Sequence, residues 1–123
     1  MKEKACPFCT IGSYLVENQL AYAIYDQYPV SKGHALIIPK RHVADYFDTT
    51  EEEKEALHSL VQQVRELQKD QFSPDGFNVG MNCGEAAGQT IFHAHIHVIP
   101  RYKGDMANPR GGVRGVIPSK QSY

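Results

Sequence analysis

The sequence has no long apolar run and no surplus of charge of either sign. Its 13 Lys and Arg residues are balanced by 14 Asp and Glu residues, which gives a net charge of −1. A chain with this balance lacks the basic surface of a non-specific nucleic-acid binder, so any anion site must be local. No run approaches the roughly 20 apolar residues of a membrane span. The start, MKEKACPFC, lacks the apolar segment of a signal peptide. We therefore expect a cytoplasmic protein that binds neither nucleic acid nor membrane.

Cysteine is scarce as well, with three residues in the chain. Cys6 and Cys9 form a C-x-x-C pair, and Cys83 stands alone. Without export, a disulfide framework is not expected, so the pair indicates a metal site or a redox site. Thioredoxin-like redox pairs lie between the strand and helix of a βαβ unit, and the pattern here predicts no such unit. Two reduced core cysteines are the plain alternative.

The periodicity of the chain predicts one α+β domain over residues 1–123. Thr49 or Thr50, with Glu52 or Glu53, forms a capping box. Behind it, apolar side chains recur every three or four positions, which predicts a long amphipathic helix over about residues 50–72. Short apolar runs near 14–16, 20–25, 34–42, 77–82 and 91–101 predict about five strands, and their short connections favour an antiparallel sheet. Residues 104–123 are rich in Gly, Pro and Arg and predict an extended tail.

Three of the six histidines alternate within the segment FHAHIHVIP, at His93, His95 and His97. On a strand these three side chains share one face, and the intervening apolar residues share the other. Alternate Cα atoms lie about 6.7 Å apart, so a straight strand cannot bring three imidazoles to one ion. A solvated sheet face is the simpler alternative. The alternation beside a glycine-rich loop, CGEAAGQT, favours separate chemical roles for the three rings.

HAHIHVI resembles the signature of the histidine triad (HIT) superfamily of nucleotide hydrolases and transferases. Two further blocks, KGHALIIPKRHV and NVGMNCGEAAGQT, are similar to family blocks in the same order and spacing. The resemblance extends from about Cys6 to Arg101. It implies a single HIT-like domain with an antiparallel sheet, one long helix and a short N-terminal helix or turn. It also implies a homodimer, paired through the long helix and a central strand.

The resemblance implies catalytic roles for three histidines. His95 corresponds to the nucleophile that attacks the α-phosphate and forms a covalent nucleotidyl-histidine. Imidazole suits this role because its neutral form is nucleophilic near neutral pH. His97 corresponds to a ring that contacts the phosphate and assists proton transfer. His34 corresponds to an additional histidine that sets the tautomer of His97; a satisfied core histidine is its alternative.

The nucleotide-binding residues implied by the resemblance lie on two loops and on the triad. Asp26 corresponds to a residue that accepts hydrogen bonds from the ribose hydroxyls, although a turn-capping Asp is nearly as good an interpretation. The glycine-rich loop would bind phosphate through backbone N–H groups, which need no net positive charge. The implied set is Asp26, Asn82, Gly88, Gln89, Thr90, His95 and His97.

The resemblance also implies a structural zinc ion. Several family branches hold one with a C-x-x-C pair, a histidine after the IPK strand and the first histidine of the triad. These positions are Cys6, Cys9, His42 and His93 here, and they make residues 1–10 a zinc-binding N-terminal segment. The Cys₂His₂ set is typical of structural zinc.

The function implied is a hydrolase that cleaves at the α-phosphate of a purine nucleotide conjugate. Asn at position 82 resembles the phosphoramidase branch of the family, whereas the loop sequence EAAGQT resembles that of the dinucleoside polyphosphate hydrolases. Both substrate classes therefore stay open. A nucleotidyltransferase is one alternative. The other is a nucleotide-sensing adaptor with incidental catalysis, which would use Arg110 and Arg114 of the 104–123 tail to reach a ligand phosphate or a partner.

Overall fold

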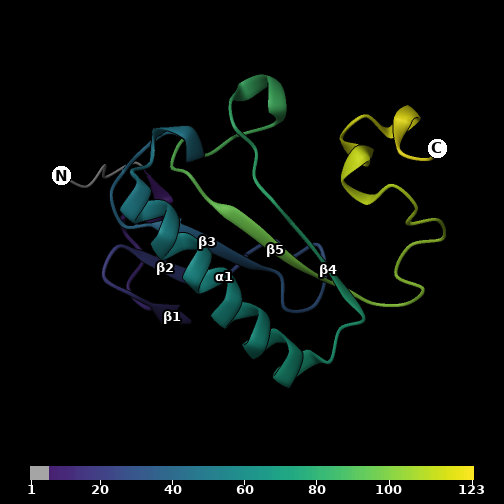
Figure 1. Cartoon of the computed structure of the whole chain (residues 1–123), viewed down its shortest axis with the longest axis horizontal. Coiled ribbons are helices and arrows are strands. Elements are labelled where there is room, and N and C mark those ends of the chain that lie inside the picture. The colour runs from purple at the N-terminus through teal and green to yellow at the C-terminus, as the bar shows by residue number, and fades with distance from the viewer. Residues whose placement is uncertain (1–5) are drawn as a thin grey trace.

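The computed structural model describes residues 6–123, and within them a single sheet is packed against one long helix (Figure 1). Its strands are β1 (Val16–Glu17), β2 (Ala21–Tyr25), β3 (Ala35–Pro39), β4 (Gly76–Gly80) and β5 (Ile96–Arg101). They lie in the order β1-β2-β3-β5-β4, and every neighbouring pair is antiparallel. The predicted α+β class, with five strands and one long helix, is confirmed. No helix of the described chain is long and apolar enough to cross a membrane.

The long helix, α1 (Glu51–Phe72), begins at a complete capping box. The Thr50 hydroxyl accepts a hydrogen bond from the Glu53 N–H, and the Glu53 carboxylate accepts one from the Thr50 N–H at 2.8 Å. These bonds satisfy N–H groups that a helix start leaves without partners. The helix ends at Ser73, whose φ of 50° lies in the left-handed region. The predicted range of about 50–72 is therefore correct to within one residue.

The sheet is covered on both faces. On one face, Leu57, Leu60 and Val64 of α1 pack against small and branched residues of β2, β3 and β5. On the other face, Tyr22, Leu36 and Ile38 pack against the N-terminal segment, in particular Phe8, Cys6 and Cys9. This second layer is held by a short 3-10 turn, Pro7–Cys9, and by the Tyr22 hydroxyl, which donates to the Phe8 carbonyl. Residues 1–5 of the predicted 1–10 segment lie outside the described residues.

Two predicted segments differ from the structure. β5 begins at Ile96, so His93 and His95 lie before the strand and only His97 is part of the ladder. The tail was expected to be extended, but Gly112–Val116 and Pro118–Lys120 form 3-10 turns. Figure 1 shows this tail beside β4, folded on itself. Its turns are closed by local contacts, in which the guanidinium groups of Arg110 and Arg114 lie 5.0 and 4.7 Å from the Tyr123 ring.

Candidate functional site

One cavity of about 630 Å³ brings together all of the predicted nucleotide-binding residues. It lies between the N-terminal segment, the end of β2, the glycine-rich loop and β5. Phe8 and Ile24 contribute apolar walls. The predicted residues that line it are Asp26, Asn82, Gly88, Gln89, Thr90, His95 and His97.

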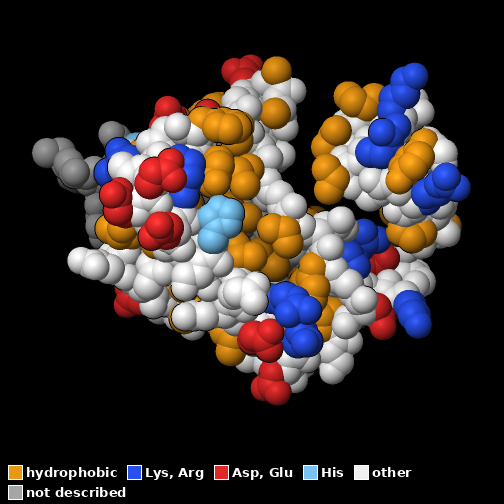
Figure 2. All heavy atoms as spheres, viewed as in Figure 1, with side chains coloured by type: hydrophobic (Ala, Val, Ile, Leu, Met, Phe, Trp, Pro, Cys, Tyr) orange, Lys and Arg blue, Asp and Glu red, His pale blue; other side chains and the backbone are white. Residues whose placement is uncertain are grey.

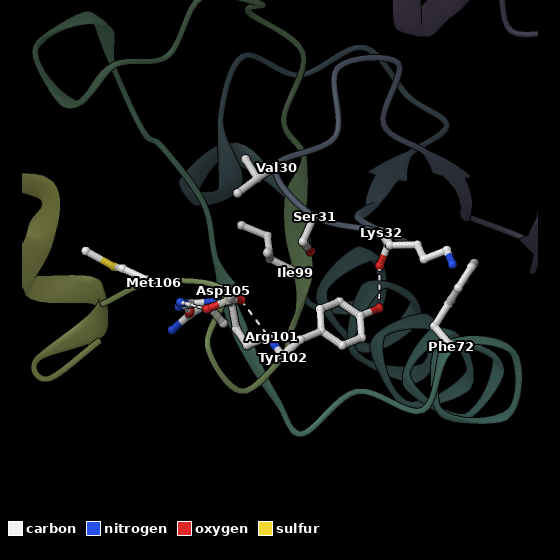
Figure 3. A pocket seen from close by; sticks show the side chains of 10 residues that line it. Val30, Ser31, Lys32, Phe72, Ile99, Arg101, Tyr102, Asp105 and Met106 are labelled. Atoms are coloured by element: carbon white, nitrogen blue, oxygen red, sulfur yellow. Dashed lines mark hydrogen bonds and ion pairs between the residues drawn. The ribbon is translucent and has the colours of Figure 1, made fainter. Parts of the chain in front are cut away.

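A larger cavity, of about 760 Å³, lies at the far end of β5 and is shown in Figure 3. Its polar groups already bond to one another. The Arg101 guanidinium is paired with the Asp105 carboxylate at 2.8 Å, and the Tyr102 hydroxyl donates to the Lys32 carbonyl at 2.7 Å (Figure 3). Because Asp105 neutralises the charge of Arg101 in this larger cavity, we place the functional site in the histidine-lined cavity.

The backbone fixes the tautomer of His95. Its Nδ1 lies 2.9 Å from the carbonyl oxygen of His93. A carbonyl oxygen only accepts, so Nδ1 carries the hydrogen and a neutral ring keeps its lone pair on Nε2. The edge of the Phe8 ring packs against the imidazole, with centroids 5.1 Å apart. His95 is half-buried and lines the cavity, so it can present a nucleophilic nitrogen there.

A second backbone contact fixes the tautomers of His34 and His97. The Val30 N–H donates to His34 Nδ1 at 3.0 Å, so the hydrogen of the neutral ring is on Nε2. That nitrogen lies 2.9 Å from His97 Nδ1 and 3.4 Å from an Asp26 oxygen. The shorter contact makes His97 Nδ1 the acceptor, so His97 carries its own hydrogen on Nε2. His97 can then donate one hydrogen bond toward a ligand.

The pKa values of this pair keep both rings neutral at neutral pH. Burial, with the neighbouring His95 and His34, lowers the pKa of His97 to about 4. Burial also lowers the pKa of His34, although the Asp26 carboxylate acts in the opposite direction. A buried imidazole loses its hydration when it is charged, which favours the neutral form. Both rings therefore act as neutral donor–acceptor groups.

The Asp26 carboxylate contacts both the Tyr28 backbone and the His34 ring. One of its oxygens accepts from the Tyr28 N–H at 2.9 Å, and the other faces His34 Nε2. The Asp26 side chain is only partly exposed. It therefore caps a turn and also lines the cavity, so the two interpretations offered by the sequence describe the same side chain.

Four predicted metal ligands converge at the other end of the site. Their Sγ and Nδ1 atoms all lie within 4.8 Å of one another: Cys6, Cys9, His42 and His93. The two Nδ1 atoms are 3.2 Å apart. The Cys9 sulfur lies 3.2 Å from His42 Nδ1, and both sulfurs lie 3.5 Å from His93 Nδ1. In a tetrahedral zinc site with Zn–N near 2.0–2.1 Å and Zn–S near 2.3 Å, these separations are about 3.3 and about 3.6 Å. The ligand set and its spacing fit a tetrahedral ion.

The backbone also prepares His93 for this role. Its Nε2 lies 2.7 Å from the Pro39 carbonyl, so Nε2 carries the hydrogen and the Nδ1 lone pair faces the thiols. Asp26, His34 and His97 form another close group. There the Val30 N–H occupies the Nδ1 lone pair of His34, so His34 would have to become an imidazolate to bind an ion through Nε2. Of the two groups found among residues 6–123, the cysteine-containing group is the one suited to a metal.

The glycine-rich loop is less open to an anion than the sequence suggests. The N–H groups of Gly88 and Gln89 donate within the loop, to Glu85 and Gly84. Gly84 and Gly88 have φ of 97° and 93°, which only glycine adopts without strain. The Gln89 side chain is buried and faces inward. Of the predicted contacts Gly88, Gln89 and Thr90, Thr90 is the one whose N–H and hydroxyl have no bond to another described residue.

The sequence could not identify which backbone groups set the imidazole tautomers. These are the carbonyls of Pro39 and His93 and the N–H of Val30. No side-chain identity could have indicated them, because every non-proline residue offers the same N–H and every residue the same carbonyl. The buried inward position of Gln89 was also missed.

Comparison with known families and structures places these features in context. A family model described as HIT domain matches residues 12–104. The AP-4-A phosphorylase of Mycobacterium tuberculosis is 37% identical over 76% of this chain and 49% of its own length. The bis(5'-adenosyl)-triphosphatase of Dictyostelium discoideum is 39% identical over 74% of this chain and 61% of its own. The matched part of the chain thus spans about half of the first enzyme and about three fifths of the second.

Two solved structures share the fold. A HIT family protein from Bacillus anthracis is 40% identical, with a TM-score of 0.77 over 83% of this chain and 77% of its own. A Zn-bound histidine triad family protein from Mycobacterium smegmatis is 33% identical, with a TM-score of 0.75 over 85% of this chain and 80% of its own.

The neutral state of His97 makes a prediction for stability in acid. In the unfolded chain the pKa of His97 is near its ordinary value of 6.5, whereas in the folded protein the pKa is about 4. The unfolded state therefore binds more protons between these values, so the free energy of unfolding falls as the pH drops from 6.5 to about 4. Urea unfolding across this range should show the loss, and His97→Gln should reduce it. His58→Gln, at an exposed position of α1, is the control. Equal pH dependence in all three proteins would contradict the assignment.

Proposed function

Because this chain belongs to the HIT domain family, we propose that it is a nucleotide hydrolase that forms a covalent nucleotidyl-histidine on His95. The substrate class is a purine nucleotide conjugate, either a dinucleoside polyphosphate or a nucleoside phosphoramidate. Two relatives carry the names of enzymes that act on diadenosine polyphosphates, which supports this class. The observation that carries the proposal is the His95 ring, with Nδ1 held by the His93 carbonyl and Nε2 free in the cavity.

The proposed reaction has two steps. His95 Nε2 attacks the α-phosphorus, a P–N bond forms, and the bond from phosphorus to the leaving group breaks with its electron pair. The ring then carries a positive charge, which the His93 carbonyl stabilises through the Nδ1–H. In the second step water attacks phosphorus, the P–N bond breaks, and the proton of the water passes to solvent. Phosphoramidate-type leaving groups would also take a proton from solvent.

His97 would support both steps as a neutral donor. Its pKa of about 4 makes it uncharged at neutral pH, so it offers the phosphate a hydrogen bond from Nε2 without becoming a cation. His34 keeps that hydrogen on Nε2 by donating to His97 Nδ1 at 2.9 Å. Asn82 and Thr90 line the same cavity and offer further polar groups to the phosphate, and Asp26 offers an oxygen to the ribose hydroxyls.

We further propose that Cys6, Cys9, His42 and His93 hold a structural zinc ion. The zinc-bound relative from Mycobacterium smegmatis and the tetrahedral spacing of the four ligand atoms support it. When bound, zinc would join three segments that are distant in the sequence: the N-terminal turn, the connection after β3 and the residues before β5. The burial that raises the pKa of the Cys6 thiol would be offset by metal coordination of the thiolate.

We propose a homodimer that uses β4 and α1. β4 is an edge strand of the described sheet, so one side of its backbone has no partner strand. Val79 and Phe92 are each 47% exposed, and Phe77 and Met81, which alternate with Val79 along the chain, are partly exposed. Figure 2 shows hydrophobic side chains gathered between α1 and β4. A second copy of the chain would cover this surface and continue the sheet.

The tail supports the adaptor alternative. Val113 and Val116 line a second cavity of about 580 Å³, which also includes His34, His97 and Asn82. They are 63% and 76% exposed, and Ile117 is 57% exposed. The guanidinium groups of Arg110 and Arg114 lie over the Tyr123 ring, so in this structure both arginines contact the tail itself. An exposed apolar wall at the cavity entrance could hold a leaving group or a partner.

Replacing the nucleophile tests the proposed chemistry. We expect His95→Ala to lower kcat on diadenosine polyphosphate and on adenosine phosphoramidate by roughly 10³-fold or more, as for other lost nucleophiles. Mass spectrometry of wild type, quenched in base during turnover, should show a nucleotidyl adduct that His95→Ala lacks. His58→Ala is the matched histidine control. Full activity of His95→Ala would eliminate His95 as the nucleophile.

Metal analysis tests the cysteine–histidine cluster. Purified protein should contain one zinc ion per chain, and Cys6→Ser should lose most of it because a hydroxyl is a poor zinc ligand. Cys83→Ser, which changes the cysteine outside the cluster, should keep it. Much less than one equivalent of zinc in untreated wild type, or equal zinc in all three proteins, would count against the site.

Charge placed on the β4 edge tests the dimer. Val79→Arg should shift the protein from dimer to monomer in sedimentation equilibrium, because a buried unpaired charge is costly. Thr10→Arg, an exposed position in the N-terminal segment, should remain dimeric. A wild type that sediments as a monomer would refute the proposal.

Removal of residues 107–123 tests the role of the tail while keeping the Arg101–Asp105 pair. If the tail forms a wall for the leaving group, KM for a dinucleotide should rise several-fold, with a smaller change for a phosphoramidate that has a small leaving group. Steady-state kinetics on both substrates decides this. Unchanged kinetics on both would favour the adaptor alternative.

A further inference from the structure

Three consecutive residues after β3 contact three different parts of the site. His42 directs Nδ1 into the cysteine cluster, 3.2 Å from the Cys9 sulfur. The Val43 carbonyl accepts from the Ala94 N–H at 2.8 Å, between the two triad positions His93 and His95. The Ala44 carbonyl accepts from the Gln89 side chain. This short segment therefore connects the metal cluster, the triad and the glycine-rich loop.

Gln89 is the residue that makes the connection to the loop. Its side chain is only 3% exposed. Its Nε2 donates to the carbonyls of Ala44 and Ile91, and its Oε1 accepts from the Gly84 N–H at 2.8 Å. The loop is closed at the same place by its backbone, since the Gln89 N–H donates to the Gly84 carbonyl. Every hydrogen-bonding group of the amide except one lone pair is engaged.

We propose that Gln89 is a positioning residue that couples the cysteine–histidine cluster to the phosphate-facing loop. This inference rests on the function proposed above. An ion in the cluster would restrain His42 and so the Ala44 carbonyl two residues later. Gln89 transmits that restraint to Gly84 and Ile91, which bound the turn that carries Thr90. The loop conformation that meets the phosphate is therefore favoured when the cluster is filled.

The coupling has a thermodynamic signature. If zinc strengthens nucleotide binding by some factor, nucleotide must strengthen zinc binding by the same factor. The proposal assigns to Gln89 the part of the coupling that acts through the loop, so removing its side chain should lower both factors together. A purely local role for Gln89 would instead weaken nucleotide binding equally with and without zinc.

The experiment compares wild type, Gln89→Ala and Gln68→Ala, each with zinc and after chelation. Gln68 is a matched control because it is a fully buried glutamine whose Nε2 also donates to two backbone carbonyls, those of Gly33 and Val98. Calorimetry gives the Kd for adenosine monophosphate and, by competition with a chelator, the affinity for zinc. Hydrogen exchange of residues 84–91 reports on the loop without any nucleotide.

We expect zinc to tighten nucleotide binding by about fivefold or more in wild type and in Gln68→Ala, at the lower end of typical couplings. In Gln89→Ala the factor should fall well below its wild-type value, and the response of loop exchange to zinc should vanish. Gln89→Glu, which keeps the acceptor and loses the donor to Ala44, should behave like Gln89→Ala. An unchanged factor in Gln89→Ala would overturn the inference.

The two proposals fail in different ways. If zinc-loaded wild type binds no nucleotide, the proposed function is wrong, and hydrogen exchange still decides the coupling. Loop exchange that ignores zinc in wild type would overturn the coupling even where nucleotide binds normally.

Discussion

Hydrogen bonds between the backbone and imidazole rings are the interactions on which the rest of the site depends. The Pro39 carbonyl accepts from His93 Nε2, and the His93 carbonyl accepts from His95 Nδ1. The lone pair is therefore on Nδ1 in His93 and on Nε2 in His95. His93 therefore offers Nδ1 to the thiols, whereas His95 offers Nε2 to the cavity. The Val30 N–H orders His34 and, through it, His97. Identical side chains acquire different chemistry because each ring meets a different backbone group.

These backbone groups are positioned by a sheet that is covered on both faces. The helix packs on one face and fixes β3 against β5. The N-terminal turn covers part of the other face, so that Phe8 lies against His95 and the two cysteines lie against His93. A metal in the cysteine cluster would therefore stabilise the layer that forms one wall of the histidine-lined cavity. The proposed structural and catalytic roles meet within a few residues of β5.

Much of this architecture could be predicted from the sequence. The capping box at Thr50 and the apolar stripe behind it are local signals, and α1 follows them closely. Each residue proposed for the metal or for the nucleotide belongs to a short recognisable block, and the structure gathers each group in one place. The start of β5 was misplaced: alternation continues through His93, but pairing with β3 begins only at Ile96. Alternating apolar and polar residues indicate an extended chain, whereas a β-strand also needs a neighbouring strand to hydrogen-bond with.

Other features depend on contacts between distant segments and leave no local signal. Gln89 turns inward because the Ala44 carbonyl lies within its reach, and the tail folds because Tyr123 returns to Arg110 and Arg114. The most direct test of the account is the ring tautomer of each histidine, measured by long-range ¹H–¹⁵N correlation NMR at neutral pH. We predict His95 with its hydrogen on Nδ1, and His93 and His97 with theirs on Nε2. A His95 ring protonated on Nε2 would contradict the central claim, because no lone pair would then face phosphorus.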